Sequence, residues 1–203
     1  MTTRPSIPGK IHLFSGTVKG GKTKQLIALA ETISYHGPVL YVNTTVDSRS
    51  HTPYSSHSVL LEPEVEHNLK TRIDMRKLAT FDELFSVGDL SKYAAVIIDE
   101  AQFWKGLRDA VLNIAEQYGC DVYVGGLFAD SNRNPFGEMH ELVSIADSVT
   151  ILGTTLCKFC SEVGVKTPAL FSYRAEDRTG QQLQIGTDYH PVCRLHYLEK
   201  TRD

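Results

Sequence analysis

Residues 16–23 read GTVKGGKT, and this stretch constrains the fold more than any other part of the chain. It fits the pattern G-x-x-x-x-G-K-[ST], in which glycines let consecutive backbone N–H groups turn inward around an oxyanion. The apolar run KIHLFS (10–15) precedes it, and apolar residues at helical spacing follow from Lys22 to His36. The sequence therefore predicts a strand, a phosphate-binding loop and a helix in succession.

This arrangement is that of a P-loop, whose backbone surrounds the phosphates of ATP. The Lys22 side chain is expected to reach the β- and γ-phosphates, and the Thr23 hydroxyl to bind Mg²⁺. The positive end of the following helix attracts the same anion. A glycine turn without a ligand is the alternative, but such a turn does not require a strand before it and a helix after it. The nucleotide-binding residues expected here are Gly16, Thr17, Val18, Lys19, Gly20, Gly21, Lys22 and Thr23.

A second motif, VIIDEAQF (96–103), ends an apolar run with two carboxylates. P-loop proteins hold Mg²⁺ through water with an acidic residue at the end of such a strand, and Asp99 is expected to have this role. Glu100, beside the γ-phosphate, can accept a proton from an attacking hydroxyl or water. The alternative for Glu100 is a cap or salt bridge at the end of the strand.

Apolar runs alternate with helical patterns along the rest of the first 153 residues. Such alternation favours an α/β fold, a P-loop NTPase core with a parallel sheet flanked by helices. Thr80 and Glu83 form a T-x-x-E capping box, which predicts a short helix over FDELFSV. Residues 44–70 are expected to form a loop, with at most a short strand near VLLE. The other expected strands are 39–43, 93–99, 121–128 and 148–152, and the other expected helices are 107–118 and 138–147.

Two ligand pairs, Cys157-x-x-Cys160 and Cys193-x-x-His196, mark the last part of the chain. Each pair can occupy one edge of a tetrahedron, so the four side chains predict a structural zinc site that closes a long loop at its base. A redox C-x-x-C motif and unrelated cysteines are the alternatives, and neither of them needs the second pair. Cys120, before an apolar strand, is expected to be a small buried side chain.

The chain length of 203 residues suits one full domain and a smaller appendage. We expect a P-loop kinase domain over residues 1–153 and a zinc-binding lobe with a lasso-like loop over residues 154–203. A net charge of -3 and the absence of a basic run argue against a nucleic-acid partner. No apolar run is long enough to span a membrane, and the lack of an export signal favours the cytoplasm.

Taken together, these motifs resemble those of type II thymidine kinases, the cytosolic kind. The resemblance spans most of the chain and includes DSR (47–49), NPFGE (134–138) and YHPVCRLHY (189–197). It implies transfer of the γ-phosphate of ATP to the 5′-hydroxyl of thymidine or a related deoxynucleoside, in nucleotide salvage for DNA synthesis. It also implies a homotetramer that is inhibited by its triphosphate end product.

The resemblance further implies roles for individual residues. Glu100 matches the catalytic base of the family, and Arg49 is expected near the phosphates. The segment between Ser161 and Tyr189 corresponds to a lasso that closes over the base of the nucleoside. The nucleoside-binding residues that it implies are Phe103, Leu127, Phe136, Ser172, Gln184, Ile185, Gly186 and Tyr189.

Three positions depart from the family pattern toward smaller side chains, namely Val18 for methionine, Ser131 for phenylalanine and Ser172 for threonine. They predict a roomier base pocket, which Phe128 could refill, and each missing methylene changes discrimination by about 1–3 kcal/mol. A kinase for another or a 5-modified pyrimidine deoxynucleoside is therefore one alternative. A fragment of a P-loop ATPase motor or helicase is another, because DEAQ is similar to the D-E-x-x box of such proteins. A non-catalytic nucleotide-binding or zinc-scaffold protein is the third.

Overall fold

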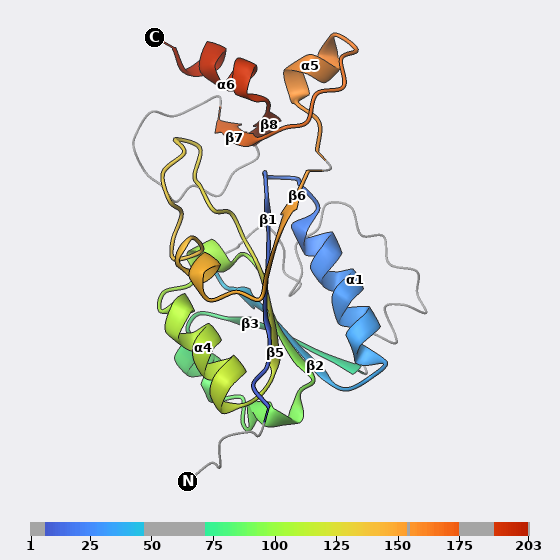
Figure 1. Cartoon of the computed structure of the whole chain (residues 1–203), viewed down its shortest axis with the longest axis vertical. Helices are drawn as coiled ribbons and strands as arrows, with labels where there is room; N and C mark the ends of the chain where they lie inside the picture. The colour runs from blue at the N-terminus through green and yellow to red at the C-terminus, as the bar shows by residue number, and fades with distance from the viewer. Residues whose placement is uncertain (1–6, 47–71, 154, 175–188, 203) are drawn as a thin grey trace.

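The computed structural model describes residues 7–46, 72–153, 155–174 and 189–202. Its main body is a six-stranded sheet, and a two-stranded sheet lies beyond one end of it (Figure 1). The strand order is β3-β2-β4-β5-β1-β6, and all five pairings are parallel. The strands are β1 Ile11–Gly16, β2 Val39–Thr44, β3 Ile73–Leu78, β4 Ala95–Ile98, β5 Asp121–Gly125 and β6 Ser148–Leu152. The predicted α/β class with a parallel sheet is confirmed.

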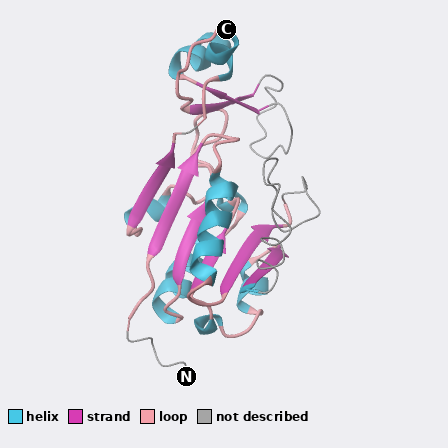
Figure 2. Ribbon diagram, turned by 90° about the vertical axis from the view of Figure 1, so that its right-hand side faces the viewer, coloured by secondary structure: helices cyan, strands magenta, loops and turns pink. Residues whose placement is uncertain are grey.

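Helix α1 (Lys22–Ser34) covers one face of this sheet (Figure 2). Its buried residues Leu26, Ile27 and Ala30 pack in one cluster with strand residues that include Tyr41 and Ile97. The three apolar positions follow the 3.6-residue period of a helix, so they share the face that meets the sheet. This packing fixes the first turn of α1, and with it the end of the glycine loop.

The opposite face is covered by α3 (Phe81–Phe85) and α4 (Leu107–Gln117). Leu84 and Val111 pack there in a larger cluster with Leu40 and Val96, which alternate along their strands with residues of the α1 face. Since both faces are buried, the central strands are continuous apolar runs, as parallel strands commonly are. The predicted N-cap is present, because Thr80 Oγ1 accepts from the N–H of Glu83 at 3.2 Å, while the Glu83 carboxylate accepts from Ala79 N at 2.7 Å instead of from Thr80 N.

One strand was missed from the sequence, and one expected helix was wrong. Strand β3 was not predicted, because Asp74, Arg76 and Lys77 interrupt its apolar residues and the strand is only partly buried at the edge of the sheet. Residues 138–147 contain only the 3₁₀ helix η3 (Glu141–Ser144) instead of a longer helix. The buried Met139 and Leu142 in this segment are three residues apart, a spacing that suits the three-residue period of a 3₁₀ turn.

The end of the chain forms a small lobe above the carboxyl ends of β1 and β6 (Figure 1). It contains an antiparallel pair of strands and two helices with an apolar cluster of their own. These elements are α5 Lys158–Glu162, β7 Phe171–Arg174, β8 Tyr189–Val192 and α6 Arg194–Thr201. Within the described residues no helix is long and apolar enough to cross a membrane.

Candidate active site

The glycine loop links β1 to α1 through a tight turn. Gly20 N donates to Thr17 O at 3.0 Å, and a Cβ on Gly20 would lie only 2.7 Å from that oxygen. Gly21, immediately before α1, has the left-handed φ of 82° that glycine adopts at little cost. Lys22 is buried, and its Nζ donates to Thr17 O at 2.9 Å. The loop therefore places an ammonium group and the N-terminus of α1 at the carboxyl end of β1, where an anion binds in P-loops.

Asp99 lies at the carboxyl end of β4 and is 1% exposed. Its Oδ2 accepts hydrogen bonds from Thr23 Oγ1 and from Tyr41 Oη, each at 2.8 Å. Burial and the nearby charge of Glu100 raise the pKa of Asp99 to about 6, although the hydrogen bonds from Thr23 and Tyr41 act in the opposite direction. A buried carboxylate beside a P-loop threonine is the donor set that Mg²⁺ prefers, since both groups offer oxygen ligands.

Asp99 reaches Thr23 across an intervening strand, because β5 lies between β4 and β1. The residue of β5 at this crossing is Gly125. A Cβ there would lie 2.5 Å from Leu26 Cδ1 and 3.6 Å from Asp99 Oδ1. The missing side chain therefore lets the carboxylate and α1 approach one another over the strand end.

Glu100 follows in a conformation that is uncommon for a residue with a side chain. Its φ is 50° and its ψ is 42°, in the left-handed region, and its N–H donates to Asp99 Oδ1 at 2.8 Å. Its Oε2 accepts from Gln102 Nε2 at 2.7 Å. Glu100 is the N-cap residue of the 3₁₀ helix η2 (Ala101–Phe103), but its side chain makes no capping hydrogen bond to the described residues of that helix. Non-glycine residues held in such conformations are concentrated at functional sites, which makes Glu100 a candidate for chemistry.

Aromatic and apolar side chains gather next to Glu100. The rings of Phe103 and Phe136 meet edge to face with centroids 5.4 Å apart, and Phe136 is buried. Leu127, after β5, donates its N–H to Gln102 Oε1 at 3.0 Å. Ser172 on β7 approaches from the small lobe, and its Oγ accepts from Val18 N at 2.9 Å. The elements thus bring the DEAQF and NPFGE motifs, the end of β5 and β7 to the phosphate side of the sheet.

The small lobe contains a compact group of four metal-binding side chains. The ligand atoms of Cys157, Cys160, Cys193 and His196 all lie within 4.8 Å of one another, and the three cysteines are buried. His196 Nδ1 lies 3.3–3.4 Å from the three sulfurs, and Cys160 Sγ lies 3.9 Å from Cys193 Sγ. Tetrahedral zinc, with bonds of about 2.3 Å to sulfur and about 2.0 Å to nitrogen, gives ligand separations of about 3.5–3.8 Å. The four side chains therefore fit a tetrahedral zinc site in which the protein supplies all four ligands.

Comparison with known proteins decides the family. The family model described as "Thymidine kinase" matches residues 9–197. The chain belongs to the thymidine kinase family. It is 32% identical to "Thymidine kinase" of Oryza sativa subsp. japonica over 98% of this chain and 70% of that protein. It is 32% identical to "Thymidine kinase a" of Arabidopsis thaliana over 94% of this chain and 75% of that protein.

A bacterial relative matches over most of both chains. "Thymidine kinase" of Bacteroides thetaiotaomicron is 31% identical over 94% of this chain and 87% of that protein. Among solved structures, "Crystal structure of Bacteroides Pif1 bound to ssDNA" has a TM-score of 0.32 and 15% identity over 71% of this chain and 38% of that chain. That likeness is too weak to bear on fold or function. The predicted resemblance to thymidine kinases is confirmed, and the reaction class of the family is ATP-dependent phosphotransfer to a deoxynucleoside.

Not all residues implied by the resemblance to thymidine kinases can be located. Tyr189 lies on β8 of the small lobe, where the guanidinium carbon of Arg174 is 5.6 Å from its ring centroid. Ser131, a position of departure from the family, offers its carbonyl oxygen to Tyr197 Oη at 2.7 Å. Phe128 is partly buried and packs against the apolar cluster on the α3–α4 face of the sheet. The remaining residues, which lie outside the described part of the chain, are Arg49, Gln184, Ile185 and Gly186.

Three polar residues of the site were missed from the sequence. Tyr41 is fully buried, and burial together with the charge of Asp99 raises its pKa well above the usual value, so the phenol keeps its proton and donates. Asn43 is also buried, and its Nδ2 has no hydrogen-bond partner in the described part of the chain. Gln102 contacts Glu100. The available signal for Tyr41 and Asn43 was a polar group inside the apolar run VLYVN, whereas Gln102 lies in the polar motif DEAQF and had no such signal.

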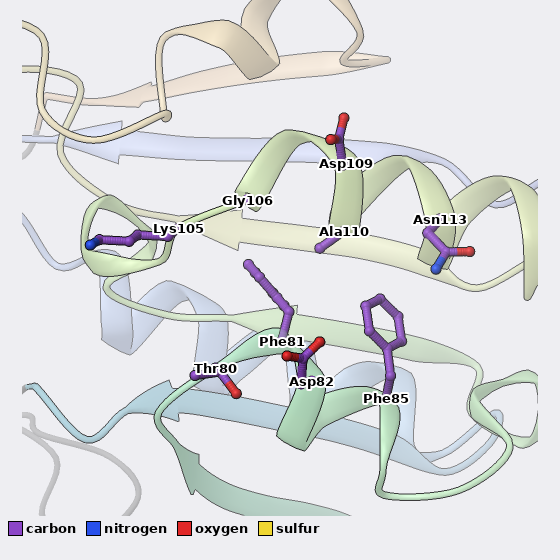
Figure 3. Close-up of a pocket in the computed structure, with 9 residues that line it drawn as sticks. All are labelled: Thr80, Phe81, Asp82, Phe85, Lys105, Gly106, Asp109, Ala110 and Asn113. Atoms are coloured by element: carbon purple, nitrogen blue, oxygen red, sulfur yellow. The ribbon is translucent and has the colours of Figure 1, made fainter.

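A cavity of about 320 Å³ lies away from these residues, between α3 and the first turns of α4 (Figure 3). Phe81 and Phe85 of α3 project toward α4 there, while Asp82, Lys105 and Asp109 are at its rim. None of the thymidine kinase site residues described above lines this cavity. It is therefore a gap between two helices on the far face of the sheet, separate from the phosphate side.

Proposed function

We propose that this chain transfers the γ-phosphate of ATP to the 5′-hydroxyl of thymidine, in nucleotide salvage for DNA synthesis. The observation that carries this proposal is the placement of Glu100 directly after Asp99, which contacts the P-loop residue Thr23, within a chain of the thymidine kinase family. One carboxylate then serves the metal-bound phosphates and the next serves the attacking alcohol. This pair of carboxylates supports the proposal, because it would serve both parts of a phosphoryl transfer.

The P-loop half binds Mg-ATP in this proposal. Main-chain N–H groups of residues 16–23 and the Lys22 ammonium neutralise the β- and γ-phosphates. Thr23 Oγ1 and Asp99 Oδ2, which are 2.8 Å apart, would hold the magnesium of the nucleotide, Asp99 through water. Arg49 adds a further positive charge. Magnesium supplies charge neutralisation at the transferred group, while the protein fixes the direction of transfer.

Glu100 is the proton acceptor in this mechanism. Its carboxylate accepts the proton of the 5′-hydroxyl as the oxygen attacks the γ-phosphorus, and ADP leaves with the β-phosphate oxygen. Phe103, Leu127 and Phe136 exclude water and pack against the base. Tyr189 and Ser172 complete the pocket from the small lobe, and the main chain at Gln184, Ile185 and Gly186 reads the pyrimidine edge.

The short side chains at positions 18 and 172 support a second candidate substrate. Ser172 has no methyl group, and its hydroxyl accepts from the backbone N–H of Val18. The side chain of Val18 is also short. A pyrimidine deoxynucleoside with a larger 5-substituent would use this space. The comparison of thymidine with 5-substituted analogues therefore belongs in the first assay.

The small lobe is proposed to hold one structural zinc ion through Cys157, Cys160, Cys193 and His196. His196 Nε2 lies 4.0 Å from Glu199 Oε2, a carboxylate of the kind that often supports a metal-bound histidine. All four tetrahedral positions are taken by protein atoms, so the ion is a scaffold. We also propose that residues 1–153 and 154–203 are two domains, since each has its own sheet and apolar cluster.

We propose a homotetramer in the cytoplasm as the working form. The edge strand β6 supports an assembly, because Val149 and Ile151 are 41% and 63% exposed there and its outer edge has no partner strand among the described elements. The gathering of three cysteines with a histidine, in place of disulfides, suits a reducing compartment.

The test is a phosphorylation assay with ATP and thymidine, deoxyuridine, deoxycytidine and 5-substituted deoxyuridines. Thymidine or a 5-substituted analogue is expected to give the highest kcat/KM, and ATP hydrolysis without nucleoside is expected to be slow. Glu100→Gln should lower kcat by about 10²–10⁴-fold and leave ATP affinity unchanged. Nucleoside-independent ATP hydrolysis at the same rate would refute the proposed reaction.

A further inference from the structure

Gln102 connects Glu100, the proposed catalytic base, to the proposed nucleoside pocket. Its side chain is 4% exposed, its Nε2 donates to Glu100 Oε2 at 2.7 Å, and its Oε1 accepts from Leu127 N at 3.0 Å. Both ends of one amide are therefore bonded to residues with proposed roles in the reaction. A charge-assisted bond of this length to a carboxylate is among the stronger hydrogen bonds in proteins.

The backbone around Gln102 is built for close approach. A Cβ on Gly126, directly before Leu127, would lie 2.9 Å from Gln102 Oε1. A Cβ on Gly137, directly after Phe136, would lie 2.2 Å from Gln102 O, and Gly137 has a φ of 56°. The two segments that carry the proposed pocket walls therefore close on η2 from two sides. Gln102 is held between them, so its amide has little freedom to turn.

A buried glutamine is more often a satisfied core residue than part of a reaction. Two features distinguish Gln102 from that case. Its donor is bonded to the side chain of Glu100, whose left-handed backbone already departs from the strand. Its acceptor is bonded to the main chain of Leu127, so one amide links the proposed pocket wall to the Glu100 carboxylate.

We propose that Gln102 is a positioning residue that holds the Glu100 carboxylate toward the 5′-hydroxyl and couples it to the wall of the base pocket. Nucleoside binding at Leu127 and orientation of the catalytic base Glu100 are then coupled. This inference depends on the proposed role of Glu100. Errors of about 1 Å in such positioning cost on the order of 10²-fold in rate, so the effect belongs mainly in kcat.

Two substitutions separate the two bonds. Gln102→Glu keeps an acceptor for Leu127 N but removes the donor to Glu100, whereas Gln102→Met keeps the approximate shape and removes both. Gln102→Glu is expected to lower kcat about 10–100-fold and to change the thymidine KM less than about threefold. Gln102→Met is expected to lower kcat similarly and also to raise KM. A wild-type kcat in Gln102→Glu would overturn the proposal.

A double-mutant cycle with Glu100→Ala tests whether Gln102 acts through Glu100. Single-turnover rates, with enzyme in excess over labelled ATP, can be measured even for slow variants. Gln102→Met should cost less than about threefold in the Glu100→Ala background, because the group it positions is gone. An equal loss in both backgrounds would assign Gln102 a structural role only and overturn the proposal.

The controls distinguish a folding defect, a wrong assignment of Glu100 as the catalytic base, and a wrong inference about Gln102. Melting temperature and ATP affinity are measured for every variant, and Gln102→Glu alone carries the test if Gln102→Met does not fold. If Glu100→Ala retains wild-type turnover, the proposed base is wrong, and this is visible without any change at Gln102. If Glu100→Ala is slow but the cycle is additive, only the inference about Gln102 fails.

Discussion

The sheet and the small lobe of this chain are held together in different ways. Two large apolar clusters pack on the faces of the sheet, whereas the buried cluster of the lobe has five members, Cys157, Cys160, Val192, Cys193 and Tyr197. Three of these five are proposed metal ligands. Apolar burial can therefore stabilise the sheet by itself, while we expect the lobe to depend on the proposed zinc. We therefore expect the fold of the sheet, which carries the P-loop, to be independent of the proposed zinc, and the fold of the lobe, which carries Ser172 and Tyr189, to depend on it.

Removing the proposed zinc is expected to have the largest effect. Cys193→Ser should lose the ion, which in small zinc domains supplies about 10 kcal/mol or more of folding free energy, and should abolish thymidine phosphorylation. ATP binding should change much less than thymidine phosphorylation, since the P-loop is packed on the sheet, although Ser172 and Thr155 of the lobe contact it. Metal content and binding of both substrates are measured on the same preparation.

Cys120→Ser is the matched control for this prediction. Cys120 is a buried thiol of the sheet half, as expected, and its Sγ donates to Leu90 O at 3.0 Å. Burial raises its pKa to about 11, so it is a poor metal ligand at neutral pH. This variant should keep its zinc and its activity. A metal-free Cys193→Ser enzyme with full activity would contradict the comparison of the two halves.

Gly137→Ala should disturb the nucleoside pocket without touching the zinc. The new Cβ would lie 2.2 Å from Gln102 O, at a φ of 56°. We expect kcat/KM for thymidine to fall about 10–100-fold, with unchanged ATP affinity. Gly164→Ala is the control, because its φ of 76° is equally unfavourable but no atom lies within 4 Å of the added Cβ. It should cost about 1 kcal/mol of stability and little activity. Equal kinetic losses in both variants would exclude a steric cause.

Tyr41→Phe probes the buried carboxylate of the ATP half. It removes one donor to Asp99, and the KM for Mg-ATP should rise about three- to tenfold, equivalent to about 1 kcal/mol. The effect should be larger at pH 6 than at pH 8, because loss of this bond raises the Asp99 pKa above about 6 and leaves more of the carboxyl protonated. Tyr93→Phe is the control, since its hydroxyl donates to Asp74 Oδ2 at 2.7 Å, away from the P-loop. An equal KM for Mg-ATP in Tyr41→Phe and Tyr93→Phe would refute the role of Tyr41.

Asp74→Asn should have the smallest effect and should be confined to the sheet. Its hydrogen bonds from Arg76 lower the Asp74 pKa below the ordinary value of 3.8, with a further contribution from Tyr93. A lowered native pKa stabilises the fold above pH 3.8, and this stabilisation is lost as the pH falls through the native value. Wild type should therefore exceed the variant by less than about 1 kcal/mol at pH 7, and the difference should narrow below pH 3.8. Urea unfolding at both pH values measures it, and zinc content should not change.

The parts of the fold that could be predicted have local signals. The glycine loop, the strand ending at Asp99 and the two ligand pairs are patterns within a few residues, and the structure has each element where it was expected. β3 was not recognisable because a half-exposed edge strand tolerates charges such as Asp74 and Arg76. Tyr41 and Gln102 were missed because their partners, Asp99 and Leu127, are distant in sequence and only the strand order brings them together.

Ser172 forms one of the hydrogen bonds that join the two halves described above. The hydroxyl of Ser172 accepts from the main chain of Val18, so the strand that carries a residue of the nucleoside pocket is tied to the loop that surrounds the phosphates. Any side chain introduced at position 172 to retune the choice of nucleoside also changes a contact of the ATP loop. A substitution at this position that changes the nucleoside preference is therefore expected to change ATP affinity as well.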